Sequence, residues 1–227
     1  LKYILAELNR RGMPAELAVM PLVESSYRPD ASNSGHHVGL WQLGGPTARV
    51  FGVEVGQQID GRYNIKASTD AALTYLEYLN KMFDGDWLLT MAPYNAGEGR
   101  VLGSIKRNQQ ADKKADYWSL SLPNVTQEYI PKVLALSQLA LEEERLDIPT
   151  EEIPKLVELE VSSLSDLKEI VDDEAVIQRF NPQLNASALD HYAVLLPYNT
   201  LKRRKLEELA IEVVEEVEVT GEELVAS

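Results

Sequence analysis

One carboxylate in this chain stands where a negative charge should be unfavourable. Glu24 closes an apolar run in residues 14–24, which the sequence predicts to be a buried helix kinked at Pro21. A buried carboxylate is costly unless it is paired, hydrogen-bonded or protonated, and a raised pKa suits a general acid. The alternative is that Glu24 bends out to water at the helix end or joins a structural ion pair.

Four short stretches, spread over a region predicted to be helical, carry most of the other residues that could do chemistry. They are VESSY (23–27), GLWQ (39–42), PYNAG (93–97) and TQEYIP (126–131). In order and spacing these stretches resemble the motifs of the lytic transglycosylase family, the goose-lysozyme-like enzymes that cleave bacterial peptidoglycan. The resemblance covers about residues 1–145. It implies a mainly α fold, with a lysozyme-like helical catalytic domain followed by a small β-α-α-β unit.

The resemblance also implies a reaction that needs one catalytic carboxylate. Glycoside cleavage requires an acid for the leaving oxygen and usually a second carboxylate. In this family the sugar's own 6-hydroxyl attacks the anomeric carbon and gives a 1,6-anhydro product. We therefore expect Glu24 to act first as acid and then as base, at the β-1,4 linkage between MurNAc and GlcNAc. The alternatives are a hydrolase of the goose-lysozyme type and an inactive protein that binds peptidoglycan.

Six further residues are implied to contact the substrate, namely Ser25, Trp41, Gln42, Tyr94, Asn95 and Tyr129. Tyrosine hydroxyls could orient Glu24 or hold the reacting sugar, and the two amides suit N-acetyl and hydroxyl groups. Trp41 could present a flat apolar face to a pyranose ring. Core packing is the alternative for Trp41 and for Tyr129.

Other carboxylates could in principle serve a hydrolase as the second catalytic group. The candidates are Asp30, Glu54, Asp60 and Glu98. Asp60 and Glu98 match acidic positions of the family pattern, and we expect both to be structural.

The elements that must position these residues are expected to be helices, with no strand before about residue 145. Helices are expected over 1–8, 38–52, 71–83 after a cap at Ser68-Thr69-Asp70, 87–92 with a break at 93–97, 100–107, and from a cap at Asn124 onward.

After an acidic, proline-marked linker at 148–154, the pattern changes to a strand (156–161), two short helices (165–171 and 174–180) and a second strand (192–196). With Phe180-Asn181-Pro182 after the second helix, this unit resembles a degenerate lysin motif module. It either binds glycan or is a structural appendage. The predicted domains are the catalytic domain at 1–147, the lysin-motif-like unit at 155–200 and an acidic C-terminal tail at 201–227.

Composition limits the other possibilities. The 227 residues carry a net charge of -14, which argues against a nucleic-acid partner, and without cysteine there are no disulfides. Three histidines without ligand spacing predict no metal site, and no cofactor is expected. The expected partner is the peptidoglycan glycan strand. We expect a periplasmic protein held at the outer membrane through an anchor outside this sequence; the sequence predicts no oligomeric state.

Overall fold

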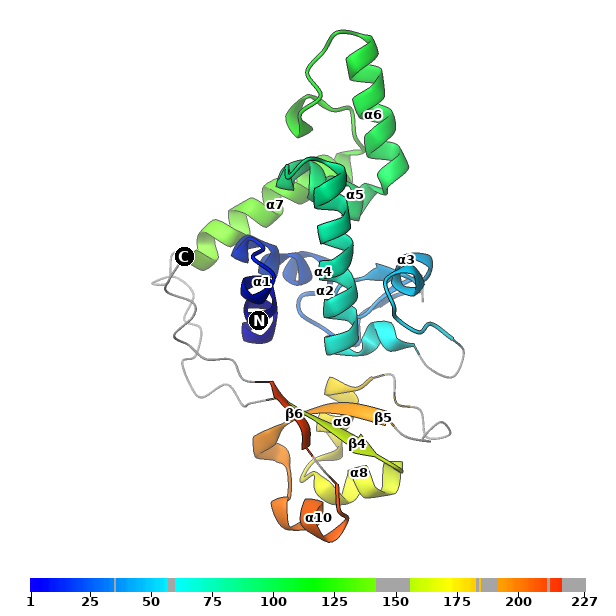
Figure 1. Ribbon diagram of the computed structural model, residues 1–227, viewed down its shortest axis with the longest axis vertical. Helices are drawn as coiled ribbons and strands as arrows, with labels where there is room; N and C mark the ends of the chain where they lie inside the picture. Colours follow the sequence, from blue (N-terminus) through cyan, green and yellow to red (C-terminus); the bar gives the residue numbers. More distant parts are fainter. Residues whose placement is uncertain are drawn as a thin grey trace. The chain divides into compact units, whose positions relative to one another are not determined.

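The computed structural model describes residues 1–34, 36–56, 60–141, 156–182, 184, 192–211 and 213–217 (Figure 1). The chain divides into two compact units, described separately below. One joins Leu1–Ala71 to Ile148–Ser227, and the other is Ala72–Asp147. The predicted linker at 148–154 and the last ten residues lie outside the described part. The predicted domain boundaries therefore stay predictions.

The helix predicted over 14–24 is two helices. After α1 (Lys2–Arg10), a 3₁₀ helix, η1 (Ala15–Val19), leads into α2 (Met20–Ser25). Pro21 lies in the first turn of α2, where its missing N–H is not needed and its fixed φ suits the helix. In place of one helix with a kink at Pro21, the helix type changes from 3₁₀ to α directly before this proline.

A small antiparallel sheet lies where no strand was predicted. Its strands β1 (Ser32–Asn33), β2 (His37–Val38) and β3 (Leu43–Gly44) have two residues each and lie in the order β1-β2-β3. The buried Arg62 donates from Nη1 to the carbonyls of His36 and Leu43, at 3.0 Å each. Of the helix predicted over 38–52, only α3 (Gly45–Val50) forms.

The helix α4 (Ile65–Met82) begins before its predicted cap. It follows a short 3₁₀ helix, η2 (Gly61–Tyr63). The Asn64 side chain accepts a hydrogen bond from the Ala67 N–H at 2.8 Å, as a capping residue does. Ser68 and Thr69 are buried within the helix. The predicted cap at Ser68-Thr69-Asp70 is thus wrong by about one turn.

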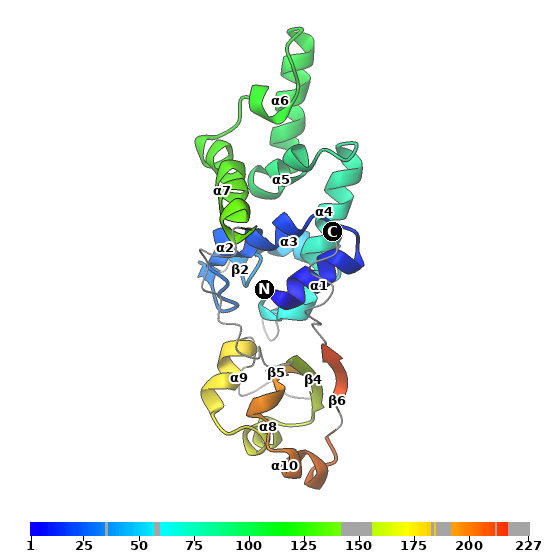
Figure 2. The same cartoon turned by 90° about the vertical axis from the view of Figure 1, so that its left-hand side faces the viewer.

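The second unit contains the later part of α4 together with α5 (Trp87–Ala96), α6 (Glu98–Gln110), the 3₁₀ helix η3 (Tyr117–Ser119) and α7 (Asn124–Leu141). Helix α5 continues through Pro93, where a break was predicted, and ends at Gly97, whose φ is +85°. Figures 1 and 2 show the segment after α6 turning back beside that helix.

The C-terminal part confirms the predicted β-α-α-β order. Its elements are β4 (Leu156–Val161), α8 (Leu164–Ile170), α9 (Glu174–Phe180) and β5 (Tyr192–Pro197). The segment expected to be a charged tail adds more structure. After η4 (Tyr198–Thr200) it forms α10 (Arg203–Glu208) and β6 (Val213–Val217). Strand β6 pairs antiparallel with β4, so the sheet order is β5-β4-β6.

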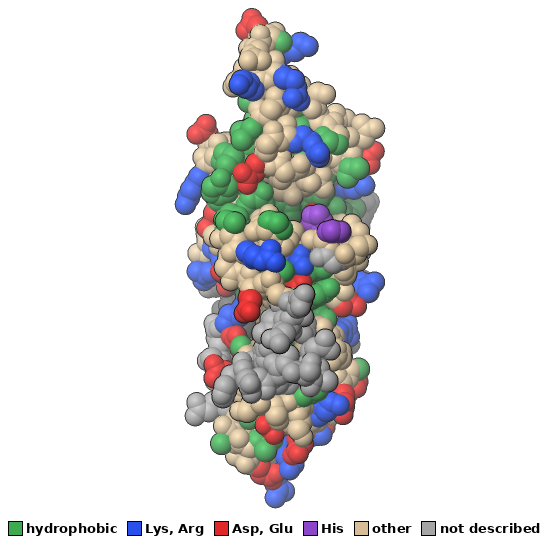
Figure 3. All heavy atoms as spheres, turned by 90° about the vertical axis from the view of Figure 1, so that its right-hand side faces the viewer, with side chains coloured by type: hydrophobic (Ala, Val, Ile, Leu, Met, Phe, Trp, Pro, Cys, Tyr) green, Lys and Arg blue, Asp and Glu red, His purple; other side chains and the backbone are tan. Residues whose placement is uncertain are grey.

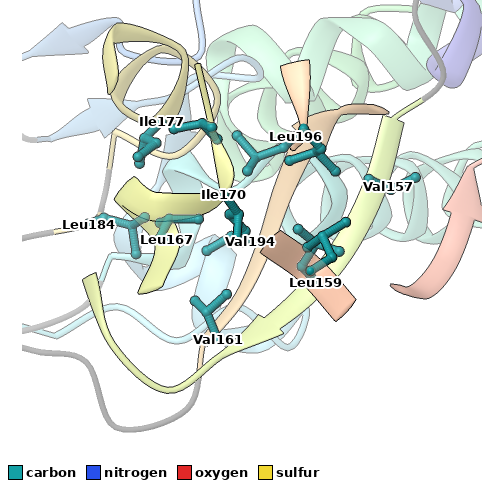
Figure 4. Close-up of a cluster of buried hydrophobic side chains, with 12 residues drawn as sticks. Val157, Leu159, Val161, Leu167, Ile170, Ile177, Leu184, Val194 and Leu196 are labelled. Atoms are coloured by element: carbon teal, nitrogen blue, oxygen red, sulfur yellow. The ribbon is translucent and has the colours of Figure 1, made fainter. Parts of the chain in front are cut away.

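An apolar core and one buried amide hold this C-terminal part together. Side chains from β4 and β5 meet those of α8 and α9, among them Leu159, Leu167 and Ile177 (Figure 4). Asn181, which is fully buried, donates to the Leu195 carbonyl at 2.8 Å and accepts from the Leu195 N–H at 2.9 Å. The Asn181 amide thus pairs with β5 as a neighbouring strand would.

Candidate active site

Glu24 lies half-buried in the last turn of α2. The chain turns sharply just beyond it, because Ser26 and Tyr27 have φ values of +54° and +58°. The Ser26 N–H donates to the Leu22 carbonyl at 3.1 Å, and the Tyr27 N–H donates to the Pro21 carbonyl at 3.2 Å. Consecutive left-handed residues other than glycine are strained, and such strain gathers at functional sites. The turn therefore fixes where α2 ends and where Glu24 stands.

Tyr27 secures this turn from the other side. Its hydroxyl donates a hydrogen bond to the carbonyl of Ala18, in η1. Burial raises the pKa of Tyr27 well above its ordinary value, so the hydroxyl keeps its proton and remains a donor at physiological pH. No role for Tyr27 was predicted from the sequence. Its place at the end of the motif stretch 23–27 was the signal that could have pointed to it.

Ser25 links Glu24 to the second motif. Its buried hydroxyl donates hydrogen bonds to the carbonyl oxygen of Leu40, at 2.8 Å, and to that of Pro21, at 3.0 Å. The bond to Leu40 ties the end of α2 to residues 39–42. The structure thus shows a positioning contact for Ser25, while its contact with substrate stays a prediction.

Trp41 lies in the interior. Its side chain is fully buried, and its Nε1 donates to the Thr69 hydroxyl at 2.9 Å. An indole in this position has no face open to a pyranose ring, so the predicted stacking is corrected to core packing. Gly39 has a φ of +77°, and a Cβ there would lie 2.0 Å from the Arg62 carbonyl oxygen. Only glycine fits this turn.

Gln42 holds the same loop together. It has a φ of +48°, and its Nε2 donates to the carbonyls of Gly39 at 2.8 Å and Ala31 at 3.2 Å. Both amide hydrogens are therefore directed at the backbone, and the side-chain oxygen is the atom that could receive a substrate donor.

In the second unit, Tyr94 lies half-buried on α5 and packs against the Tyr75 ring, with centroids 5.7 Å apart. Tyr75 is hydrogen-bonded to Glu98, and burial first, then the nearby Glu98 carboxylate, raises the pKa of Tyr75. Glu98 therefore has a structural partner, as expected. Tyr129 is buried, with 4% of its surface exposed, on α7.

Asn95 is fixed by a residue to which the sequence analysis gave no role. The Thr126 hydroxyl donates to the Asn95 Oδ1 at 2.8 Å, and the Thr126 carbonyl accepts from the Tyr117 hydroxyl at 2.9 Å. The accepting oxygen of Asn95 faces Thr126, which leaves its NH₂ group as the donor that a ligand could meet. Thr126 opens the fourth motif stretch, so its place there was the available signal.

Two other candidate carboxylates are engaged by arginines. The Arg62 guanidinium donates two hydrogen bonds to the Asp60 carboxylate, at 2.9 and 2.6 Å. In this bidentate ion pair the arginine side chain is largely buried. Asp30 pairs with Arg28 at 3.0 Å, and that hydrogen bond lowers the Asp30 pKa. The Asp30 carboxyl is therefore suited to remain ionised, which does not suit a general acid, and the Asp60 carboxylate is already bound to Arg62.

The predicted site residues thus fall into two groups. Glu24, Ser25, Trp41 and Gln42 lie in the first unit, and Tyr94, Asn95 and Tyr129 lie in the second. Ser25 connects Glu24 to the second motif, and Thr126 connects α7 to Asn95.

Comparison with known proteins gives consistent matches. Residues 3–117 match the family model described as Transglycosylase SLT domain. The chain is 39% identical over 194 residues to membrane-bound lytic murein transglycosylase D of Escherichia coli, covering 82% of this chain and 43% of that protein. It is 35% identical over 99 residues to the peptidoglycan transglycosylase of Escherichia phage T7, covering 43% of this chain and 7% of that protein.

A solved structure gives the same fold. An inactive mutant of the lytic transglycosylase Slt from Pseudomonas aeruginosa superposes with a TM-score of 0.52 at 24% identity, covering 63% of this chain and 24% of that one. This likeness shows the fold alone. The chain spans less than half of the length of its Escherichia coli relative.

Proposed function

The chain belongs to the transglycosylase SLT domain family, and from this premise we propose that it is a lytic transglycosylase of peptidoglycan. It cleaves the β-1,4 linkage between MurNAc and GlcNAc without water and leaves a 1,6-anhydro-MurNAc end. The relatives' names, which refer to murein and peptidoglycan, support the substrate class. The expected place of action is the periplasm at the outer membrane. Among the described residues, no helix is long and apolar enough to cross a bilayer.

The proposal assigns both proton transfers to Glu24. The protonated carboxyl gives its hydrogen to the glycosidic oxygen while the bond from that oxygen to the anomeric carbon breaks. The 6-hydroxyl oxygen of the same sugar then bonds to the anomeric carbon, and its proton returns to the Glu24 carboxylate. Atoms and charges balance without a second carboxylate.

One observation carries this assignment. Glu24 stands half-buried in the last turn of α2, beside a strained turn that fixes its backbone. Gln42, Tyr94, Asn95 and Tyr129 are proposed to contact the sugars.

The test is the product analysis of purified sacculi digested with wild-type protein and with Glu24→Gln. Anhydro-muropeptides from the wild type alone support the proposal. Reducing muropeptides would instead indicate a hydrolase of the goose-lysozyme type, and no release would indicate a binding protein. Asp30→Asn is the matched control, because it makes the same carboxylate-to-amide change at an exposed position and should leave activity within about two-fold.

For the C-terminal part we propose binding to peptidoglycan through the β-α-α-β unit at 155–200. The support is the element order β4-α8-α9-β5, which is the order on which the resemblance to a lysin motif module rests. A bracing role is the competing candidate, and a specific contact favours it. Lys66, at the start of α4, forms an ion pair with Glu158 on β4.

A further inference from the structure

Cations outnumber acidic residues in the segment around α6, although the chain as a whole is acidic. Residues 98–120 hold five of the 22 lysines and arginines and three acidic residues, Glu98, Asp112 and Asp116. The five are Arg100, Lys106, Arg107, Lys113 and Lys114, and all are exposed. We call α6 and the segment that returns beside it, residues 98–120, the α6 hairpin. Figure 3 shows blue side chains gathered over the part of the molecule that α6 forms.

The hairpin also carries an exposed tryptophan on a rigid base. Trp118 is 63% exposed, although tryptophan is a residue that proteins usually cover. Its ring meets the buried Tyr117 ring edge-on, with centroids 4.9 Å apart and planes at 73°. The Tyr117 hydroxyl is anchored to the Thr126 carbonyl at 2.9 Å. Trp118 is therefore held in place while its own surface faces outward.

One amide brings the backbone next to this tryptophan close to that of Lys114. The Asn108 Nδ2, on α6, donates to the carbonyls of Lys114 at 2.7 Å and Ser119 at 2.8 Å. Because both carbonyls bond to one nitrogen, Lys114 and the residue after Trp118 are neighbours. The Ser104 hydroxyl adds a second tie by donating to the Ser121 carbonyl at 3.1 Å. The α6 hairpin is thus a stapled structure that presents positive charge and an aromatic surface together.

From this juxtaposition we infer that the α6 hairpin is a binding surface for the peptide-bearing glycan of peptidoglycan, separate from the bond-cleaving residues. This inference rests on the proposed function for its partner. Peptide stems carry free carboxylates next to saccharide rings, which complement lysine and arginine side chains beside an indole. Nucleic acids and anionic membranes also carry negative charge; peptidoglycan is chosen here because it is the substrate class of the proposed function.

The test measures retention on insoluble sacculi in a Glu24→Gln background, so that binding is recorded without cleavage. Lys113→Gln with Lys114→Gln should weaken retention about five-fold at low salt, and the difference should shrink as salt rises. Trp118→Ala should also weaken retention. The matched control is Lys81→Gln with Lys132→Gln, which removes the same charge from exposed positions on α4 and α7 and should change nothing.

Insoluble chitin, a β-1,4-linked N-acetylglucosamine polymer with neither peptide stems nor carboxylates, identifies the recognised group. The lysine effect should disappear on chitin, while the Trp118 effect should persist. Equal retention of the hairpin variants and the control pair would overturn the inference, as would a hairpin effect seen only on phosphatidylglycerol vesicles. A wild type that makes no anhydro product but still shows the hairpin effect on sacculi would refute the proposed reaction and leave the binding surface standing.

Discussion

The Thr126 hydroxyl donates a hydrogen bond to the Asn95 Oδ1 over 2.8 Å and so joins α7 to α5. An asparagine amide can be turned over without changing its shape, so a fixed donor decides which end of it a ligand meets. With Thr126 occupying the oxygen, the Asn95 NH₂ group is available to a sugar oxygen.

Replacing that hydroxyl should therefore change catalysis more than folding. Thr126→Val keeps the shape and removes the donor, and we expect kcat/KM to fall by about three- to ten-fold, as for the loss of one neutral hydrogen bond. Thr126→Ser keeps the hydroxyl and should remain near wild type. Steady-state kinetics on soluble glycan strands and thermal melting measure the two effects. Equal activity of the valine and serine variants would exclude this role.

Trp41 should behave as a core residue. Trp41→Phe removes the indole N–H that reaches Thr69, and we expect a loss of about 1 kcal/mol in the free energy of unfolding. Activity per folded molecule should be unchanged well below the melting temperature. A cycle with Thr69→Val separates the bond from the lost ring volume, because the two changes should not add. A stable Trp41→Phe protein with a raised KM would instead support sugar stacking.

The buried Tyr27 predicts how stability depends on alkaline pH. Burial raises the Tyr27 pKa in the folded state, so the unfolded chain loses this proton first as pH rises. The stability linked to the proton is therefore complete below the ordinary tyrosine pKa of about 10 and is lost as pH rises beyond it. Denaturant unfolding between pH 8 and about 11 should show this decline.

The variant Tyr27→Phe tests whether Tyr27 causes this decline, through the slope of the unfolding free energy against pH. Its stability at neutral pH should be lower, because the bond to Ala18 is gone, but its decline with pH should be shallower. Tyr75, whose pKa is also raised by burial, contributes to the remaining slope. Parallel curves for the wild type and the variant would mean that Tyr27 does not dominate the alkaline decline.

Removal of the C-terminal part distinguishes binding from bracing. A chain ending at Asp147 should fold and cleave, but sacculi should retain it less, because linked sites gain from effective concentration. The comparison is a pull-down of both proteins together with their melting temperatures. Equal retention with a lower melting temperature would support the brace.

The ion pair offers a direct control for the bracing role. Lys66→Glu and Glu158→Lys should each destabilise the full chain by about 0.2–1 kcal/mol, and the two together should recover most of that loss.

The sequence predicts elements well where local pattern decides them. The predicted helix over 174–180 and the strand over 156–161 have the bounds of α9 and β4, because alternation and capping residues define both. Strands β1 to β3 could not be predicted, since two residues carry no period and Arg62 from a later segment organises them. Strand β6 was also not predicted, because its glutamate-rich segment forms a strand by pairing with β4, which is distant in sequence.

In the candidate site too, some features could be predicted from the sequence and others depend on the fold. Glu24 and its motif partners are marked by residue type and order, which the family match supports. Whether a side chain faces the core depends on its neighbours, so Trp41 was expected to lie open and is instead buried against Thr69. Thr126 and Tyr27 act through single hydrogen bonds, which no spacing rule reveals.

The pairing of the Asn181 amide with Leu195 has a consequence for the chemical ageing of the protein. Spontaneous deamidation of asparagine begins when the next backbone nitrogen attacks the side-chain carbonyl, and a proline nitrogen carries no hydrogen to lose. Asn181 precedes Pro182, so this succinimide route is closed at the one amide that pairs with Leu195. An aspartate there would set a carboxylate against the Leu195 carbonyl. During long storage Asn181 should therefore keep its amide, while exposed asparagines elsewhere in the chain deamidate to aspartate.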